Sequence, residues 1–383
     1  MSLFNISQKI NFAKSFVLKK SPLYVQFYIT ARCNLACEQC NIIYADAKHQ
    51  EMSIDEINLV AENLKKIGVN IVLLIGGEPF VRKDIHEIVK AFTSRNIHVR
   101  MQTNGIANEE QLKKCVENGG KDISISLDTL KPELQEEING GFNKSWSRAI
   151  NTISMVSNIF PEGSTAFFNS VIMPKNLQEI INVIKFATKI GWGVSLVPVH
   201  VSSPDKPMGY RTLDYENNVT FNENYFEDIK KLIKTLKEVK KNYNLYDSEE
   251  YIEDIENFLL NKPVKWREKN NNVCDSPNLY FAISPSGTIK TCCDYEALED
   301  VYVYSKDFPK LYQSGEIENI VNPITKGCDG CMYGSYPEIS ITARYLTPFL
   351  QRLKYFNYSP PKIKKLTKEE LQTIATDILN EQN

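Results

Sequence analysis

The chain has 383 residues, of which 42% are hydrophobic and 24% are charged, the composition of an ordinary globular protein. Its formal net charge of −2 excludes the basic surface typical of nucleic-acid-binding proteins. No run reaches the roughly 18 consecutive apolar residues of a membrane span, and the lysine-interrupted N-terminus does not resemble a signal peptide. Because nine cysteines stand in a chain without an export signal, we expect a cytoplasmic protein whose reduced thiols are available as metal ligands.

Short β-rich runs alternate with amphipathic helical stretches from residue 22 to about residue 200. This alternation predicts an α/β fold with a parallel sheet, a partial (β/α)6 TIM-like barrel whose site lies at the carboxyl ends of the strands. One helix is expected over residues 55–67, where Ser53 and Glu56 form a capping box. The expected strands are residues 23–29, 69–75, 97–103, 123–127, 166–173 and 193–199.

Three cysteines directly follow the first expected strand: Cys33, Cys37 and Cys40 form a C-x3-C-x2-C run. Their thiolates can converge on one soft metal centre, but a closed cysteine site needs four ligands. A [4Fe–4S] cluster held by these three residues would keep one iron open to bind a small molecule. Half of a structural zinc site and a chance cluster are the alternatives, although zinc sites usually have a second cysteine pair nearby.

The second expected strand ends in Gly76, Gly77, Glu78 and Pro79. The two glycines permit a sharp turn and a close approach of the backbone to a ligand. Glu78, at the carboxyl end of the strand, can accept hydrogen bonds from a cationic amino group. Taken alone, these four residues would indicate a plain βα turn.

The cysteine run and the Gly-Gly-Glu-Pro motif, on consecutive strands, resemble those of the radical S-adenosylmethionine (SAM) superfamily, and the resemblance extends over most of the chain. It implies that the three cysteines ligate a [4Fe–4S] cluster that binds SAM. In that family the reduced cluster cleaves SAM to a 5′-deoxyadenosyl radical, which abstracts a hydrogen atom from the substrate. Gly76, Gly77, Glu78 and Pro79 would belong to the SAM site.

The resemblance also implies roles for residues at later strand ends. Asn104 follows the third strand, Ser126 lies in the fourth and Asn176 follows the fifth, and each would contact SAM. Asp128 would face SAM or the substrate and is a candidate catalytic residue. From the residues alone, Asn104 is also ordinary turn chemistry, and Asp128 can cap the following helix. Gln39 departs from the family, many of whose members place an aromatic residue there, beside the adenine.

Prolines and polar residues interrupt the alternation over residues 202–220, where we expect a long loop over the barrel mouth. Residues 221–260 are expected to be helical, with most of their charge on a solvated face. The expected divisions are a radical SAM barrel over 1–220, a helical linker over 221–265, an auxiliary-cluster domain over 266–345 and a helical tail over 346–383.

A second group of cysteines comprises Cys274, Cys292, Cys328 and Cys331, and a hairpin with Gly287 at its turn separates the first two. Four cysteines can close a complete tetrahedral ligand set. They resemble the twitch extension of radical SAM enzymes, a shortened SPASM domain, which implies one auxiliary [4Fe–4S] cluster. A structural zinc site with the same ligands is the alternative.

Cys293, adjacent to Cys292, is left over and has three interpretations. It can replace Cys292 as a ligand, pack as a small hydrophobe, or donate a hydrogen atom to a substrate radical as a catalytic residue. Cys115 is expected to be structural. His200, at the end of the sixth strand, is expected either to touch substrate or to serve the structure.

Residues 345–358 are rich in Leu, Phe and Tyr and include Arg352 and Lys354. An amphipathic helix of this kind can bind a membrane surface or a lipid-like substrate. More often such a stretch packs on the core of its own domain.

We predict a radical SAM oxidoreductase or epimerase that abstracts hydrogen from a carbohydrate- or cyclitol-like small molecule, with the auxiliary cluster aiding oxidation or epimerisation. About twenty residues precede the first strand, too few for the leader-binding domain common in peptide maturases, so peptide modification is the second hypothesis. A non-catalytic metal-binding module is the alternative from another class. The expected partners are the substrate and a flavodoxin- or ferredoxin-type electron donor, with no nucleic acid.

Overall fold

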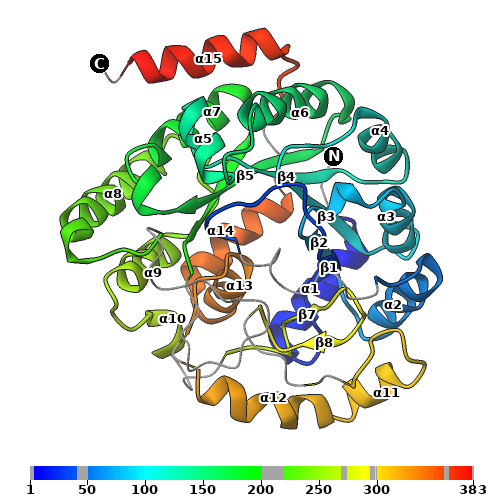
Figure 1. Ribbon diagram of the computed structural model, residues 1–383. Coiled ribbons are helices and arrows are strands. Elements are labelled where there is room, and N and C mark those ends of the chain that lie inside the picture. The colour runs from blue at the N-terminus through cyan, green and yellow to red at the C-terminus, as the bar shows by residue number, and fades with distance from the viewer. Residues whose placement is uncertain are drawn as a thin grey trace.

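One sheet of eight strands organises the chain, in the order β6-β5-β4-β3-β2-β1-β7-β8 (Figure 1). The computed structural model describes residues 4–40, 51–200, 219–268, 274–293, 298, 300–328, 330–357 and 362–381. Neighbours from β6 to β7 are parallel, whereas β7 and β8 are antiparallel. The predicted partial barrel is confirmed. Its strands are β1 (Tyr24–Thr30), β2 (Ile71–Gly76), β3 (His98–Thr103), β4 (Asp122–Ser126), β5 (Thr165–Ile172) and β6 (Gly193–Pro198), followed by β7 (Tyr280–Ile283) and β8 (Ile289–Lys290).

Helices cover the outer face of this sheet (Figure 1). The predicted capping box is confirmed at the first of them, because the Glu56 N–H donates to Ser53 Oγ at 3.3 Å and the Ser53 N–H donates to the Glu56 carboxylate at 2.8 Å. The helices of the barrel are α2 (Ile54–Lys66), α3 (Ile85–Thr93), α4 (Glu109–Glu117), α5 (Pro132–Ile138), α6 (Ser145–Ile159) and α7 (Ile180–Ile190). The remaining helices are α1 (Ile6–Leu18), α8 (Phe226–Val239), α9 (Glu249–Leu259), α10 (Lys265–Glu268), α11 (Phe308–Gln313), α12 (Glu316–Lys326), α13 (Ser335–Arg344), α14 (Leu346–Asn357) and α15 (Lys368–Asn380).

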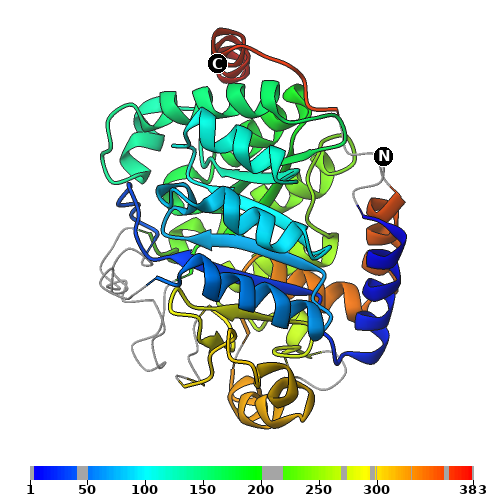
Figure 2. The same ribbon diagram turned by 90° about the vertical axis from the view of Figure 1, so that its right-hand side faces the viewer.

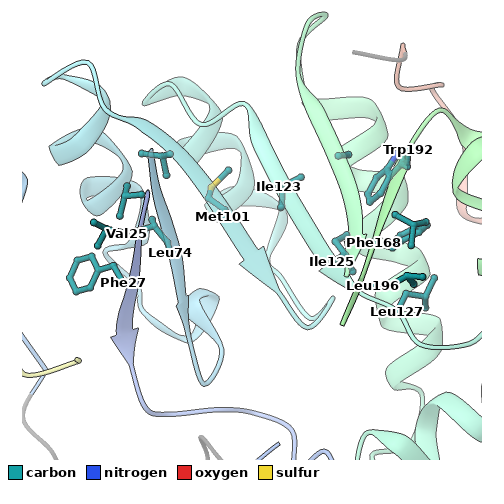
Figure 3. Close-up of a cluster of buried hydrophobic side chains, with 14 of the residues drawn as sticks. Val25, Phe27, Leu74, Met101, Ile123, Ile125, Leu127, Phe168, Trp192 and Leu196 are labelled. Atoms are coloured by element: carbon teal, nitrogen blue, oxygen red, sulfur yellow. The ribbon is translucent and has the colours of Figure 1, made fainter. Parts of the chain in front are cut away.

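Alternate strand residues face the helices and form the main hydrophobic core (Figure 3). Phe27 on β1 and Phe168 on β5 are fully buried, and Phe168 packs on Trp192 with ring centroids 4.9 Å apart. Cys115 on α4 is buried in the same core, as expected of a structural cysteine. The core thus fixes the positions of the strands, and with them the residues at the carboxyl ends of the strands.

The other face of the sheet, the inside of the barrel, is mixed: β2 presents the apolar Ile71, Leu73 and Ile75, and the other strands add polar side chains. Gln26 and Tyr28 point inward from β1, because they alternate with core residues. On β3, β5 and β6 the inward residues are partly exposed while the residues between them are buried. Neutral inward side chains include Gln102, Asn169 and Ser195.

The second cysteine region continues the barrel sheet, because β7 pairs in parallel with β1. The predicted hairpin is confirmed by the antiparallel pairing of Ala282 with Lys290 and of Ile283 with Ile289. Of the loop expected over residues 202–220, all but the last two residues lie outside the described ranges. In the described part of the chain, no helix has the length and apolar character needed to cross a membrane.

Candidate functional site

The first cysteine group occupies the loop after β1. All three thiols are partly exposed, and the Leu35 N–H donates to Cys33 Sγ at 3.4 Å. Burial of the sulfurs and the neighbouring Cys40 raise the pKa of both Cys33 and Cys37. Because the pKa values of these neighbouring thiols are raised, they lose their protons only when a metal cation binds them. An N–H group that donates to a sulfur then stabilises the metal-bound thiolate. This donor set suits an iron–sulfur cluster.

Gly76 and Gly77 are required by the close approach of β2 to the cysteine loop. The Gly77 N–H donates to the Thr30 carbonyl at 2.9 Å, and the Glu78 N–H donates to the Arg32 carbonyl at 2.8 Å. A Cβ atom on Gly77 would lie 2.2 Å from the Arg32 carbonyl oxygen, and one on Gly76 would lie 2.2 Å from that of Thr30. The motif therefore fastens the start of the cysteine loop to the end of β2.

Glu78 is fully buried and joins the ends of two strands. Its carboxylate accepts the Phe80 N–H at 2.9 Å and the Asn104 N–H at 2.6 Å, while burial raises the pKa of this carboxyl to about 7. Asn104 then reaches the cysteine loop, because its amide donates to Asn34 at 2.7 Å and to Cys33 Sγ at 3.8 Å. Its oxygen also closes the expected turn by accepting the Ile106 N–H at 3.0 Å. The turn interpretation of Asn104 is confirmed by this last bond, and its contact with SAM stays a prediction.

Asp128 follows β4 and is buried beside the cysteine loop. Its carboxylate accepts the Val171 N–H at 2.7 Å and the Gln39 amide at 3.4 Å, and burial raises its pKa to about 6. The alternative that Asp128 caps the next helix is wrong, because α5 has Lys131 at its N-cap and no side-chain capping bond. Asp128 lies close enough to Cys37 to raise the pKa of that thiol.

The remaining residues that the resemblance places near SAM differ in whether they keep a polar atom free of protein hydrogen bonds; they are Gln39, Ser126 and Asn176. The Oε1 atom of Gln39 is buried without a hydrogen-bond partner in the described structure. Ser126 is the partly exposed last residue of β4. Asn176 is fully buried, and its amide accepts the Met173 N–H at 2.8 Å and donates to the carbonyls of Asp128 at 3.0 Å and Val171 at 2.7 Å. In this structure Asn176 ties β4 to β5.

The second cysteine group is assembled from three segments of the chain. The thiols of Cys292, Cys328 and Cys274 all lie within electrostatic range of Cys331, whose pKa is raised first by burial and then by these neighbours. Burial likewise raises the pKa of Cys274 to about 11. In the described residues, no three Cys, His, Asp or Glu side chains already converge as a closed metal site does. Four neighbouring cysteines, whose thiolates would repel one another without a cation, nevertheless form a donor set that suits an iron–sulfur core or zinc.

The Cys328–Cys331 loop is held by side chains that the sequence did not identify. The Trp266 indole N–H donates to the Cys331 carbonyl at 3.0 Å, and the Arg267 guanidinium donates to the Cys328 carbonyl and, at 2.9 Å, to that of Thr325. These residues stand on the short α10, and no local pattern marks them.

His200 holds the same loop from the end of β6. Its Nε2 accepts the Met332 N–H at 2.9 Å, so the proton sits on Nδ1, which donates to the Pro198 carbonyl at 2.8 Å. Its ring stacks on Tyr333 with centroids 3.8 Å apart. Of the two roles expected for His200, the structural one is the one the contacts describe.

Cys293 lies on the inner face of the barrel. Its thiol donates to Gln26 Oε1 at 3.2 Å and accepts the Tyr28 hydroxyl at 3.3 Å, both on β1. The side chain is 7% exposed. Cys293 thus sits between the second cysteine group and the barrel interior.

Comparison with known proteins finds a family model and relatives that are similar to part of this chain. Residues 27–187 match the model of the Radical SAM superfamily. The probable GTP 3′,8-cyclase of Methanocaldococcus jannaschii is 31% identical over 165 residues, covering 43% of this chain and 54% of that protein. The GTP 3′,8-cyclase of Clostridium perfringens is 32% identical over 174 residues, covering 43% and 52%. The chain spans about half the length of these curated relatives.

Solved structures are similar over nearly the whole chain. Streptococcus suis SuiB has a TM-score of 0.57 at 17% identity, over 94% of this chain and 82% of that one. The protein anSMEcpe, with bound AdoMet and a peptide, has a TM-score of 0.56 at 16% identity, over 93% and 99%. At these identities the likeness concerns the fold. Residues 27–187 therefore form a domain of the radical SAM superfamily, whose members use a [4Fe–4S] cluster and SAM.

Proposed function

We propose that this chain is a radical SAM enzyme with two cluster sites, which abstracts a hydrogen atom from a neutral, hydroxyl-rich small molecule of the carbohydrate or cyclitol kind. Cys33, Cys37 and Cys40 would hold the SAM-binding [4Fe–4S] cluster. Cys274, Cys292, Cys328 and Cys331 would hold an auxiliary [4Fe–4S] cluster. When bound, the first cluster supplies the electron that cleaves SAM to the 5′-deoxyadenosyl radical, and the second is a one-electron acceptor or donor.

Residues around the first cysteine group support the placement of SAM there. Glu78 and Asn104 hold the loop from the ends of β2 and β3. The unpartnered Oε1 of Gln39 would accept a hydrogen bond from the adenine amino group, in place of the aromatic contact that the family favours. Ser126 and Asp128 would bound the same space from β4.

The proposal on the substrate class rests on the side chains that line the inner face of the barrel. Gln26, Gln102 and Asn169 present neutral amides there, and such groups match hydroxyls without requiring charge. Arg100 on this face lies 3.5 Å from the Asp122 carboxylate and over the Phe167 ring at 4.6 Å. The relatives named GTP 3′,8-cyclase take a substrate with a triphosphate, for which a cluster of cations would be the natural recognition element. GTP is therefore the comparison substrate in the test below.

Peptide modification is the second candidate. SuiB, which has a similar fold, is known in complex with its precursor peptide SuiA. The similar fold is compatible with a barrel that binds a segment of a peptide. No residue contact in the described structure favours a peptide over a sugar. Both substrate classes belong in one assay.

Cys293 separates the two proposed outcomes of hydrogen abstraction. In an epimerisation, its S–H bond would break and a new C–H bond would form on the substrate radical, leaving a thiyl radical that one electron and one proton from a flavodoxin- or ferredoxin-type donor must restore. In a dehydrogenation, the substrate radical would release one proton to solvent and pass one electron to the auxiliary cluster, and Cys293 would take no part. Cys293→Ala should therefore arrest an epimerase and spare a dehydrogenase.

The test is anaerobic reconstitution followed by metal analysis and a turnover assay. We expect about eight irons per chain and reductive formation of 5′-deoxyadenosine. Deuterated cyclitols and sugars, GTP and a synthetic peptide are then compared, and deuterium should enter 5′-deoxyadenosine only with the first class. Bound zinc and no 5′-deoxyadenosine would contradict the enzyme proposal, and deuterium transfer from the peptide or GTP would replace the substrate class.

A further inference from the structure

Exposed apolar side chains gather on one face of the molecule. Nine large hydrophobic side chains are exposed in the described residues, and six of them lie on α1 and α14. These two helices come from opposite ends of the chain and touch through Phe16 and Phe349, whose rings are 6.1 Å apart (Figure 2). The six side chains are Ile6, Ile10, Val17, Leu18, Leu346 and Leu350.

The stripe on α1 has the spacing of a surface helix whose outer face is apolar. Ile6 and Val17 are 78% and 81% exposed, and with Ile10 they fall on one side of the helix. The opposite side packs on the barrel through the buried Phe12. Exposure to this extent on an otherwise well-covered protein indicates an interaction surface.

The charge on the two helices is of one sign. Neither α1 nor α14 contains an Asp or Glu residue, although the whole chain has 47 of them and a net charge of −2. On α1, Lys9 and Lys14 flank the apolar stripe, one on each side. An apolar stripe bordered by lysines is the pattern of helices that lie in the interface of an anionic bilayer.

This pattern disfavours a second copy of the chain as the occupant. In a two-fold dimer the same patch meets itself, so the lysines of one α1 would face those of the other with no carboxylate on either helix. A bilayer with acidic headgroups presents the opposite charge to this face instead. We propose that α1 and α14 form a docking surface for an anionic lipid membrane.

The surface lies at the amino-terminal edge of the strands. Phe4 packs on His98, the first residue of β3, at 5.0 Å, and Asn5 bonds Asn96 just before that strand. The first cysteine loop and Glu78 follow the carboxyl ends of β1 and β2, on the opposite edge of the sheet. The second cysteine group lies on the side of α1 instead, since Cys274 precedes β7, which is parallel to β1, and Lys19 pairs with Asp275 at 3.2 Å. Docking would therefore leave the catalytic edge facing the aqueous phase, open to an electron donor.

Vesicle flotation of the reconstituted full chain tests this surface. We expect binding to vesicles of equal parts phosphatidylglycerol and phosphatidylcholine, little binding to pure phosphatidylcholine, and release by salt. The double variant Ile10→Asp/Val17→Asp should lose roughly tenfold in binding, and Lys14→Glu roughly fivefold. Both should keep their iron content and 5′-deoxyadenosine formation, since neither touches the cysteine groups.

A matched control makes the same change elsewhere. Leu59 and Ile320 are 38% and 46% exposed on α2 and α12, and Leu59→Asp/Ile320→Asp should bind vesicles as the unchanged protein does. Failure of the unchanged protein to float with anionic vesicles would overturn the proposal. So would a dimer in solution that Ile10→Asp/Val17→Asp dissolves, because the stripe would then be a self-association surface.

Discussion

The two cysteine groups differ in how the chain builds them. Cys33, Cys37 and Cys40 stand in one short loop, which is fastened to the sheet by backbone bonds from the end of β2 and by the Asn104 side chain after β3. The second group comes from three separate segments and is held by side chains of α10 and of the end of β6. The first group is built by one short segment of the chain. The second group forms only when the segments after β6 and around β7 and β8 come together.

The largest expected effect separates the two groups directly. Replacing Cys33, Cys37 and Cys40 together by Ala should remove about four irons and abolish 5′-deoxyadenosine formation. Replacing Cys328 and Cys331 by Ala should also remove about four irons but leave SAM cleavage measurable. Iron analysis and chromatography of the reaction products check both. Loss of all iron in either variant would contradict two independent sites.

Gly77→Ala should damage only the first group. The new Cβ would collide with the Arg32 carbonyl, an overlap that costs about 3 kcal/mol or displaces the loop. We expect the loss of the SAM-dependent cluster signal with the second cluster intact, measured by electron paramagnetic resonance. Gly327→Ala is the control, since its Cβ would have no neighbour closer than 3.7 Å.

His200→Phe should weaken only the second group. The phenyl ring keeps the stacking on Tyr333 but leaves the Met332 N–H unpaired, which costs about 1–3 kcal/mol. We expect faster iron loss from the second site and a shifted reduction potential, measured in the chain that lacks the first three cysteines. His86→Phe, on the outer helix α3, should change neither quantity.

A smaller effect concerns the buried carboxylate that braces β6 near the second group. Burial and the nearby Glu338 raise the pKa of Asp247 to about 7, while Ser195 and the Leu196 N–H donate to it at 2.9 and 2.7 Å. Because the folded state keeps a proton that the unfolded state releases above its ordinary carboxyl pKa, stability should fall between about pH 4 and 7, by at most about 1.4 kcal/mol per pH unit. Urea unfolding at several pH values measures the total slope, to which the buried carboxyls Glu78 and Asp128 contribute with the same sign, and Asp247→Asn should remove the share due to Asp247. An unchanged slope would contradict the assignment.

The contrast between the groups also explains what the sequence could predict. Hydrophobic alternation predicts the six barrel strands because side-chain period and burial are local properties. The first cysteine group, Gly76 and Gly77 are predictable for the same reason. His200, Trp266 and Arg267 act through bonds to carbonyls and N–H groups far along the chain, so no spacing marks them. The parallel pairing of β7 with β1 is likewise a product of the whole fold.

Asn176 and Asp128 illustrate a further limit. Both stand at strand ends, where a resemblance assigns cofactor contacts, yet the amide of Asn176 is committed to backbone groups. Whether such a side chain can contact a cofactor depends on its burial, and its burial depends on how the loops pack in the folded protein. Asp128 keeps a contact with Gln39 and a place beside Cys37, so it stays a candidate for the SAM site.

The most direct test of one open and one closed cluster is the response of each to SAM. Electron paramagnetic resonance spectra of the reduced protein should change when SAM is added, and the change should disappear when Cys33, Cys37 and Cys40 are replaced by Ala while the second signal stays. A SAM-dependent change that survives in that variant would contradict the assignment of the open site to the first cysteine group.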